Sequence, residues 1–524
     1  MRDFQSPGRS AVYAMGGMAA TSHPLASQIA VRALEDGGNA ADAAVAAAFA
    51  LGVCEPQMAG IGGDAFALIR PAGETRILGL NGSGRAPLGL EAAALRAAGH
   101  RMMPERDVRA VTVPGAVDAF ARLIADWGRL GLARAVAPAI RLAEEGVPVA
   151  PRVAFDWAAA AGLLAGDARR FYLHAGAAPR PGDVFRAPGL AEALRRIGAE
   201  GRAGFYEGPV AEDMATSLQA LGGAHTLADF AAHRSDYVKP IAGPYRGTQL
   251  VELPPNGQGA TALLTAAILA RFDLSRLDPL GAERAHLEAE AAKLAYDARD
   301  RFVADPGVRL DHMLAPATAD RLAGLIDPRR AMAAPEAAAE AIHRETVCLS
   351  VVDRDRMAVS LIYSVFHSFG AGLASRRFGI NFHNRGAGFS LRPGHPNEAA
   401  GGKRPMHTII PGMLSRDGRL DMAFGVMGGA YQPTGHVRLV SNLVDFGMDP
   451  QAAVDAPRSF PDAGLLQLET GYSDAVAAAL AERGHRVVRR AAPLGGAQAV
   501  LIDEERGVLI GVSDPRKDGC ALGL

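Results

Sequence analysis

Hydrophobic and polar positions alternate residue by residue over Thr346–Asp353. Val347, Leu349 and Val351 fall on one side of this run, which is rich in β-branched residues. A period of two with such a composition is typical of a β-strand. A second predicted strand, Met357–Phe366, follows after a charged turn. The residues before the first strand are rich in alanine and carry no apolar periodicity, so a linker ends where this strand pair begins.

Helical periodicity dominates the first two thirds of the chain, and short strands dominate the last third. Helices are predicted at Pro24–Asp36, Ala40–Val53, much of Phe120–Gln219, from Ala260, at Ala282–Arg301, in short pieces within Gly307–Ala341, within Val426–Gly447, and at Gln451–Asp455 and Ser473–Arg483. Strands are predicted at Ala65–Arg70, Thr75–Asn81, from Val111, twice within Ser235–Pro254, and at Gly379–His383, Ile409–Ser415, Met422–Val426, Leu465–Glu469, Arg486–Arg489, Ala499–Asp503 and Val508–Ser513. This mixture predicts stacked sheets covered by helices.

Composition excludes several classes of function. The chain has 524 residues, 49% of them hydrophobic, and a formal net charge of −1. Balanced charge argues against a nucleic-acid or anionic-membrane partner. Three scattered cysteines make no disulfide framework, and no His/Cys cluster has metal-ligand spacing. The N-terminus has no signal-peptide pattern and Ala40–Val53 is too short to span a membrane, so we expect a cytoplasmic protein.

Thr346, at the junction between linker and strand, is a candidate nucleophile. If the bond before it were cut, this threonine would carry both a nucleophilic hydroxyl and an α-amine that titrates near neutrality. The amine is then a base for the hydroxyl proton. The alternative is an ordinary strand-opening threonine, whose β-branched side chain suits a pleated surface.

The chain as a whole resembles the γ-glutamyltranspeptidase family of N-terminal-nucleophile hydrolases. The resemblance rests on an ordered series of motifs spread over nearly the whole chain. These are GGNAADAAVAAAFALGVCEPQMAGIGGDAF, VPGAVDAF, PPNGQG, HLEAEAAKLAYDARDRFVADP, TVCLSVVDRDRMAVS, GKRPMHTIIP, VMGGAYQPTGHV, DAPR and SDPRKDG. It implies an α+β fold, a four-layer αββα sandwich, built from both chains of a proenzyme that cuts itself.

Matching the family motifs position by position assigns the catalytic residues. Thr346 corresponds to the nucleophile, so the bond cut is Glu345–Thr346. Ser364 corresponds to a hydroxyl that hydrogen-bonds the nucleophile, although an ordinary polar strand residue is the alternative. Gly428 and Gly429 correspond to the family's Gly-Gly pair, whose N–H groups suit an oxyanion hole; a tight turn alone also explains them. No metal or organic cofactor is expected.

Cleavage there would give a helix-rich large chain, 1–345, and a strand-rich small chain, 346–524. The two chains are expected to form one intertwined unit, and a homo-oligomer is left open. Apart from each other, the expected partner is a small-molecule amide, with no nucleic acid and no membrane.

Departures from the family pattern bear on the substrate. The family holds a glutamyl α-amine with Asn, Gln and an acidic residue, where this chain has Phe366, Arg385 and Gly388. The family's Ser-Ser pair is His407–Thr408 here. A zwitterionic head group needs an anion near its ammonium, so this site suits a carboxylate without an ammonium. The pattern is similar to the oxamate amidohydrolase branch, cytoplasmic enzymes that hydrolyse a small carboxylate amide.

Four residues are therefore candidates for substrate binding. Arg385, with Arg85, is predicted to clamp a carboxylate through bidentate hydrogen bonds, and His407 and Thr408 to contact the substrate. The family's clamping arginine precedes an Ala-Pro pair, and Arg85 is displaced from that position. The alternatives are arginines that cap carbonyls or pair with Asp64, and a histidine satisfied by its neighbours.

Three other functions stay open. One is a γ-glutamyl hydrolase or transferase acting on glutathione-like substrates, and another is an acylase for larger amides such as β-lactam side chains. The third is an unprocessed relative without catalytic activity. The acyl group and the acceptor, water or an amine, are not determined by these residues.

Overall fold

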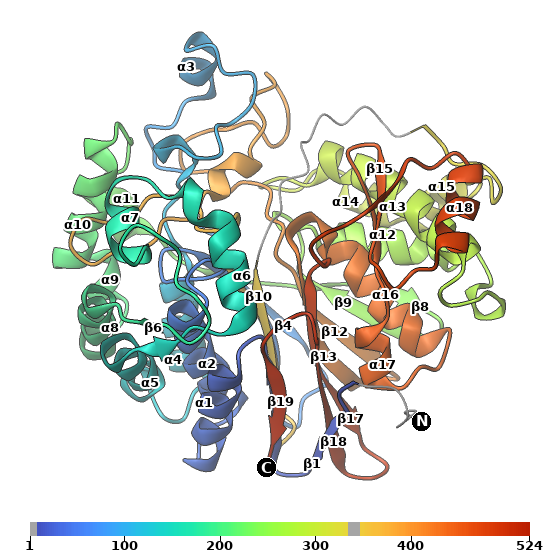
Figure 1. Ribbon diagram of the computed structural model, residues 1–524, viewed down its shortest axis with the longest axis horizontal. Coiled ribbons are helices and arrows are strands. Elements are labelled where there is room, and N and C mark those ends of the chain that lie inside the picture. Colours follow the sequence, from blue (N-terminus) through green and yellow to red (C-terminus); the bar gives the residue numbers. More distant parts are fainter. Residues whose placement is uncertain (1–7, 334–345) are drawn as a thin grey trace.

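Two face-to-face β-sheets form the centre of the computed structural model, which describes residues 8–333 and 346–524 (Figure 1). Within these residues each large sheet has seven strands, all paired antiparallel. One sheet runs β19 (Cys520–Gly523), β2 (Gly17–Thr21), β10 (Val347–Asp353), β11 (Ala358–Ser364), β3 (Asp64–Arg70), β4 (Leu78–Gly82), β7 (Asp236–Val238). The other runs β1 (Val12–Ala14), β18 (Val508–Ser513), β17 (Gly496–Asp503), β13 (Arg419–Met427), β12 (Pro411–Arg416), β9 (Thr248–Glu252), β8 (Ile241–Tyr245).

The alternation in β10 separates two cores, as the sequence predicts. Cys348 and Val352 face the second sheet and join an apolar core between the sheets. Val347, Leu349 and Val351 point the other way, into a core shared with helices. Both faces of the strand are covered, so β10 lies in the buried interior of the sandwich.

The first helical layer covers the outer face of the β10 sheet, on the left of Figure 1. Every residue of α2 is buried, and its run of alanines allows neighbouring helices to approach closely. Asn39 and Asp42 form a capping box at its start. The layer comprises α1 (Pro24–Glu35), α2 (Ala40–Cys54), α4 (Ala116–Trp127), α5 (Leu132–Glu145), α8 (Pro188–Glu200), α9 (Ala203–Tyr206), α10 (Gly208–Ala220) and α11 (Leu227–Ala232).

The second helical layer covers the outer face of the other sheet, on the right of Figure 1. It comprises α12 (Gly259–Leu269), α13 (Ala282–Phe302), α14 (Leu310–Leu314), α15 (Pro316–Ala323), α16 (Gln432–Val444) and α17 (Pro450–Asp455), with α18 (Asp474–Glu482) packed on α13. The four layers make the predicted αββα sandwich. Among the described helices, none combines the length and apolarity needed to cross a bilayer.

Smaller elements lie outside the four layers. They are α3 (Ala92–Ala97), α6 (Pro151–Ala160), α7 (Gly166–Tyr172), the pair β5 (Val147–Pro148) and β6 (Val184–Phe185), the sheet of β14 (Ser459–Asp462), β15 (Leu465–Leu468) and β16 (Val487–Arg489), and five short 3₁₀ turns. The predicted strands near residues 465 and 486 are therefore real but belong to this peripheral sheet.

Strands from the two sides of residue 346 are interleaved in both sheets. Strands β10 and β11, which follow residue 346, lie between β2 and β3, and β18 to β12 lie between β1 and β9. The predicted pair within residues 235–254 is three strands, of which β7 joins one sheet and β8 and β9 join the other.

Two predicted strands are wrong, and three central-sheet strands, β1, β2 and β19, were missed. The stretch from Val111 is extended, but it is not part of a sheet; the N–H of Val113 donates to the carbonyl of Arg85. Gly379–His383 folds into a loop with one isolated bridge. Two of the missed strands, β2 and β19, are rich in Gly and Ala, which have weak strand propensity, and β1 has only three residues.

Candidate active site

Thr346 immediately precedes β10 and is buried among the described residues. The register of β10 against β11 pairs Val347 with Tyr363, which places Thr346 opposite Ser364. Their hydroxyl oxygens are 3.3 Å apart, with Thr346 donating. Antiparallel pairing, rather than proximity in sequence, brings these two hydroxyls together.

Phe366, two residues after Ser364, has an unusual backbone conformation. The N–H of Phe366 donates to Ser364 Oγ at 2.8 Å. Phe366 has φ of 79°, in the left-handed region that bulky side chains seldom adopt. Such strain costs roughly 1–3 kcal/mol and persists only where surrounding contacts impose it.

The Gly-Gly turn lies at the same end of the sandwich as Thr346. Gly425 near the end of β13 packs closely on Cys348 near the start of β10. A Cβ added at Gly425 would lie only 3.0 Å from the Cβ of Cys348. The turn follows three residues later, with φ of 121° at Gly428 and 58° at Gly429. Both values favour glycine.

Gln258 of the PPNGQG loop fastens this turn to the segment around His407. Its amide nitrogen donates to the carbonyl oxygen of Gly429 at 2.9 Å and to that of Thr408 at 2.6 Å. Its carbonyl oxygen accepts from Arg299 at 3.2 Å. The loop motif contributed to the family resemblance, but nothing in the motif singles out Gln258 itself.

Arg385 is fully buried directly behind Phe366. Its guanidinium carbon lies 4.0 Å from the centre of the Phe366 ring, a cation–π contact. One of its nitrogens donates to Thr408 Oγ1 at 2.9 Å. The structure thus joins Thr346, Ser364, Phe366, Arg385 and Thr408 in one continuous chain of contacts.

Asp64 supplies the negative charge behind this chain. His407 Nε2 lies 3.0 Å and His383 Nδ1 3.5 Å from the same Asp64 oxygen. The other oxygen accepts from the N–H groups of Gly84 and Gly115 at 3.1 and 3.0 Å. All three side chains are fully buried, so Asp64, His383 and His407 form a closed cluster.

The charges in this cluster follow from its burial. Burial alone would raise the pKa of Asp64, but His383, His407 and Arg385 hold that pKa well below its usual range. Burial, reinforced by Arg385, lowers the pKa of His407 to about 3. Near neutral pH Asp64 is therefore ionised and His407 is neutral, and Asp64 balances the charge of Arg385. His407 is the histidine satisfied by its neighbours.

Arg85 is not brought to Thr346. Its side chain is 43% exposed and faces Asp236 and Asp305 at 3.7 and 3.5 Å. It also donates to the carbonyl of Gly402 at 3.2 Å. A Cβ at Gly84 would lie 1.5 Å from the carbonyl of Val113, so the backbone packs tightly there while Arg85 turns outward.

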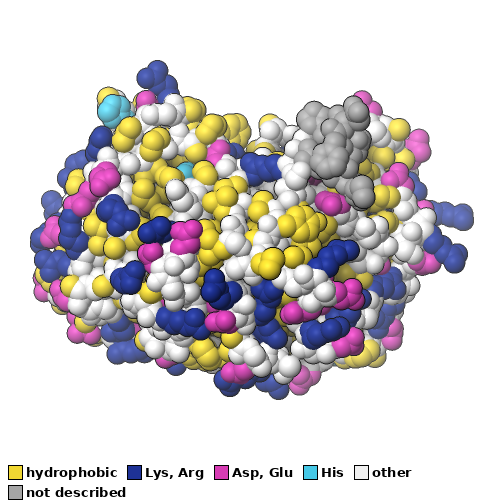
Figure 2. Space-filling view, turned by 90° about the horizontal axis from the view of Figure 1, so that it is seen from below, with side chains coloured by type: hydrophobic (Ala, Val, Ile, Leu, Met, Phe, Trp, Pro, Cys, Tyr) yellow, Lys and Arg dark blue, Asp and Glu magenta, His cyan; other side chains and the backbone are white. Residues whose placement is uncertain are grey.

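A cleft of about 1760 Å³ opens in front of Thr346 and Gly428. Among its described lining residues, Arg and Lys outnumber Asp and Glu by more than two to one. The outer face shown in Figure 2 instead has Lys and Arg interspersed with Asp and Glu. A locally basic cleft in a chain of balanced charge attracts anionic ligands.

The αββα sandwich, with a buried threonine hydroxyl where a central strand begins and a cleft before it, defines an N-terminal-nucleophile hydrolase, an enzyme that acts on amides. Residues 26–524 match the family model described as gamma-glutamyltranspeptidase. The chain belongs to the gamma-glutamyltranspeptidase family.

Its relatives in this family differ in the substrates that their names state. The chain is 34% identical to the glutathione hydrolase-like YwrD proenzyme of Bacillus subtilis, covering 97% of this chain and 98% of the relative. It is 36% identical to the oxamate amidohydrolase proenzyme of Klebsiella pneumoniae, with the same coverage. A crystal structure of cephalosporin acylase from Bacillus halodurans superposes with a TM-score of 0.93 at 39% identity, covering 100% of this chain and 99% of that one.

Proposed function

We propose that the chain is a self-processing amidohydrolase that forms an acyl ester on Thr346 and transfers the acyl group to water. The observation that carries this proposal is the contact of Thr346 with Ser364 beside the cleft. The bond to be cut is Glu345–Thr346, and Glu345 lies outside the described residues. Cleavage would give the chains 1–345 and 346–524, whose strands are interleaved in both sheets.

Both steps use the same hydroxyl. In processing, Thr346 Oγ attacks the preceding carbonyl, the acyl group shifts from nitrogen to oxygen, and water hydrolyses the ester. In turnover, the released α-amine takes the hydroxyl proton as the oxygen attacks the substrate amide. Ser364 orients the hydroxyl. Processing and turnover both use only groups of the protein and water, without a cofactor.

The N–H groups of Gly428 and Gly429 are assigned to the oxyanion of the tetrahedral intermediate. The turn lies at the Thr346 end of the sandwich, and Gln258 fixes it by donating to the Gly429 carbonyl. Fixed donors of this kind stabilise developing charge without reorganising during the reaction.

We propose a small amide that bears a carboxylate, of the oxamate type, as the substrate. The basic lining of the cleft supports an anion, and the positions that would hold an ammonium carry Phe366 and Gly388. Arg385 is the cation behind Phe366, and Gln258 joins the carbonyl of its partner Thr408 to that of Gly429. If Arg385→Ala leaves KM for the preferred acid amide unchanged, Arg385 does not bind the carboxylate.

The size of the cleft favours a second candidate, an acylase for larger amides. About 1760 Å³ exceeds the roughly 300–1,000 Å³ typical of drug-sized ligand pockets. The similarity to the cephalosporin acylase structure points the same way. A panel of oxamate, a γ-glutamyl anilide and a side-chain-bearing cephalosporin would separate these two functions from a γ-glutamyl hydrolase.

The decisive experiment compares wild type, Thr346→Ala and Thr346→Ser on a denaturing gel. Wild type is expected to give two bands, the smaller beginning at Thr346 by N-terminal sequencing. Thr346→Ala should remain one band, with amidase activity lower by roughly three orders of magnitude or more. Thr346→Ser keeps a hydroxyl and should still cleave. One band from all three proteins would favour an unprocessed binding protein.

A further inference from the structure

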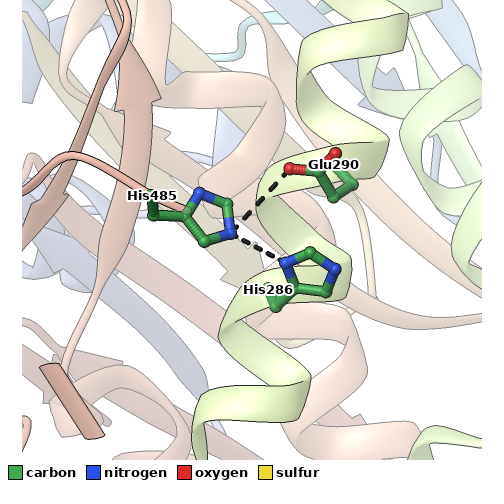
Figure 3. Close-up of side chains that lie close together, drawn as sticks. All are labelled: His286, Glu290 and His485. Carbon is green, nitrogen blue, oxygen red and sulfur yellow. Dashed lines mark hydrogen bonds and ion pairs between the residues drawn. The ribbon is translucent and has the colours of Figure 1, made fainter. Parts of the chain in front are cut away.

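Two imidazoles and a carboxylate meet beside the cleft, apart from the Thr346 contacts (Figure 3). His286 and Glu290 stand one turn apart on the same face of α13. His485 comes from the turn between α18 and β16. All three are buried, at 0%, 0% and 7% exposure, so they are held by the surrounding structure rather than by solvent.

The three side chains converge on a small volume. His286 Nδ1 and His485 Nε2 are 2.7 Å apart, and His485 Nε2 lies 3.8 Å from Glu290 Oε1. One ligand atom from each residue lies within 4.8 Å of the other two. Ligands of a tetrahedral zinc ion stand roughly 3.3 Å from one another, as follows from metal–ligand bonds of about 2.0–2.1 Å. Shifts of about half an ångström would centre an ion.

Neighbouring groups already orient two of the three side chains. His286 Nε2 lies 2.8 Å from the carbonyl oxygen of Asp327, so this nitrogen carries the proton and the Nδ1 lone pair faces His485. Glu290 Oε2 accepts from the N–H of Met332 at 2.8 Å. A histidine that donates its remote N–H to a carbonyl is the arrangement that fixes imidazoles at metal sites.

We propose that His286, Glu290 and His485 bind one divalent transition-metal ion, for which zinc fits best. Two imidazoles and one carboxylate are a ligand set that zinc accepts, and water from the adjoining cleft would be the fourth ligand. His485 and Lys293 both line that cleft, which gives the ion a route in. This inference does not depend on the proposed function.

The contact between the two imidazoles shows what binding would require. Because His286 Nδ1 offers its lone pair, His485 Nε2 carries the proton that joins the two rings. This proton would move to His485 Nδ1, so that both facing nitrogens offer lone pairs to the ion.

Lys293 is the group that opposes binding. Its ammonium lies 2.6 Å from Glu290 Oε1 and 3.1 Å from the carbonyl of Met332. It competes with the ion for the carboxylate and repels a second positive charge. Because the Lys293 side chain is 12% exposed and lines the cleft, it can turn toward water when the ion binds.

A bound ion would tie three segments together. It would join α13 to the turn holding His485, and through the bonds to Asp327 and Met332 it would also brace the last described residues before position 334. We expect the ion to have a structural role, because the described contacts of its three ligands lead to Asp327, Met332 and Lys293 and not to Ser364.

Titration of the chelator-treated, full-length protein with zinc by isothermal calorimetry tests the proposal, with cobalt absorption as a second readout. Wild type should bind one ion and melt at a higher temperature with zinc. His286→Ala and His485→Ala should each weaken binding at least roughly tenfold. His174→Ala removes an exposed histidine and should bind as wild type does.

Lys293→Met gives an effect of opposite sign, which misfolding cannot imitate. Removing the competing ammonium should tighten zinc binding roughly tenfold, equivalent to a change of one in log affinity. The proposal is overturned if wild type binds no zinc, if both histidine variants bind it normally, or if Lys293→Met does not bind more tightly. In each case the residues form a hydrogen-bonded histidine pair only.

Discussion

Two buried clusters in this molecule each contain one carboxylate and two histidines, yet their surroundings differ. In the first, both oxygens of Asp64 are occupied: Gly84 and Gly115 donate to one, and His383 and His407 lie against the other. Arg385 lowers the pKa of Asp64, and the cluster is fully buried. Each oxygen of Asp64 thus has two neighbours within the buried cluster.

In the second cluster the histidines meet each other rather than the carboxylate. His286 and His485 are in contact at 2.7 Å, whereas Glu290 pairs with the cleft-lining Lys293. Residue types alone therefore do not define a metal site. The deciding features are whether the carboxylate is already fixed by a buried cation and whether solvent reaches the ligands.

Removing each carboxylate charge should give the largest difference between the clusters. Asp64→Asn removes the buried charge that His383, His407 and two backbone N–H groups surround, and we expect a loss of about 3–5 kcal/mol in the free energy of unfolding. Glu290→Gln leaves Lys293, which can turn to water, so a loss of about 1–2 kcal/mol is expected. Urea unfolding monitored by circular dichroism measures both.

Zinc binding by the same two variants is the control. Asp64→Asn should leave zinc binding unchanged, whereas Glu290→Gln should weaken it. Equal stability losses in the two variants would mean that Arg385 does not depend on Asp64, and the contrast between a closed and an open cluster would be wrong.

The next prediction concerns how the free energy of unfolding falls in acid, with and without zinc. His407 and His485 both have a pKa lowered to about 3 in the folded protein, against 6.5 ordinarily. The unfolded chain then binds more protons, so the stability each contributes is complete above pH 6.5 and declines toward pH 3. The loss is about 1.4 kcal/mol per pH unit for the fully buried His407, and smaller for His485, whose charge solvent in the cleft screens.

Zinc separates the two contributions. Protons displace a bound metal, so saturating zinc should steepen the decline in wild type and in His407→Gln. It should have no such effect in His485→Gln. Urea unfolding at pH 6.5, 5.5 and 4.5, with and without zinc, gives the slopes; a zinc effect that persists in His485→Gln would contradict the assignment of this ligand.

The sequence predicted the layers because the periodicity that defines them is local. Alternation over Val347–Asp353 correctly separated the core between the sheets from the core under the helices. It failed where strands have few β-branched residues, as in β2, and where an extended segment such as the one from Val111 has no neighbouring strand. Sheet membership depends on partners distant in sequence.

For the site, motif matching located the backbone positions, but it did not show where side chains point. Arg85 and Arg385 were predicted together, and the structure turns the first to the surface and buries the second. The helix spacing of His286 and Glu290 was a visible signal, four residues apart on one face. Their third partner, His485, is 195 residues beyond Glu290 in sequence, so only the fold brings it near.

The smallest effect we predict concerns Ser364, and it tests whether the two clusters serve separate functions. Ser364→Ala removes the hydroxyl that receives the Thr346 contact and the Phe366 N–H, so cleavage and turnover should slow roughly tenfold, or about 1.4 kcal/mol in the barrier. Zinc affinity should not change.

Ser360→Ala is the matched control, since Ser360 lies on the same strand and donates to the Phe424 carbonyl at 2.6 Å, away from Thr346. Timed gels and amidase rates would show equal behaviour of the two variants if Ser364 were only a polar strand residue. A slowed Ser364→Ala with unchanged zinc binding would instead place the catalytic hydroxyls and the histidine pair in separate functional units.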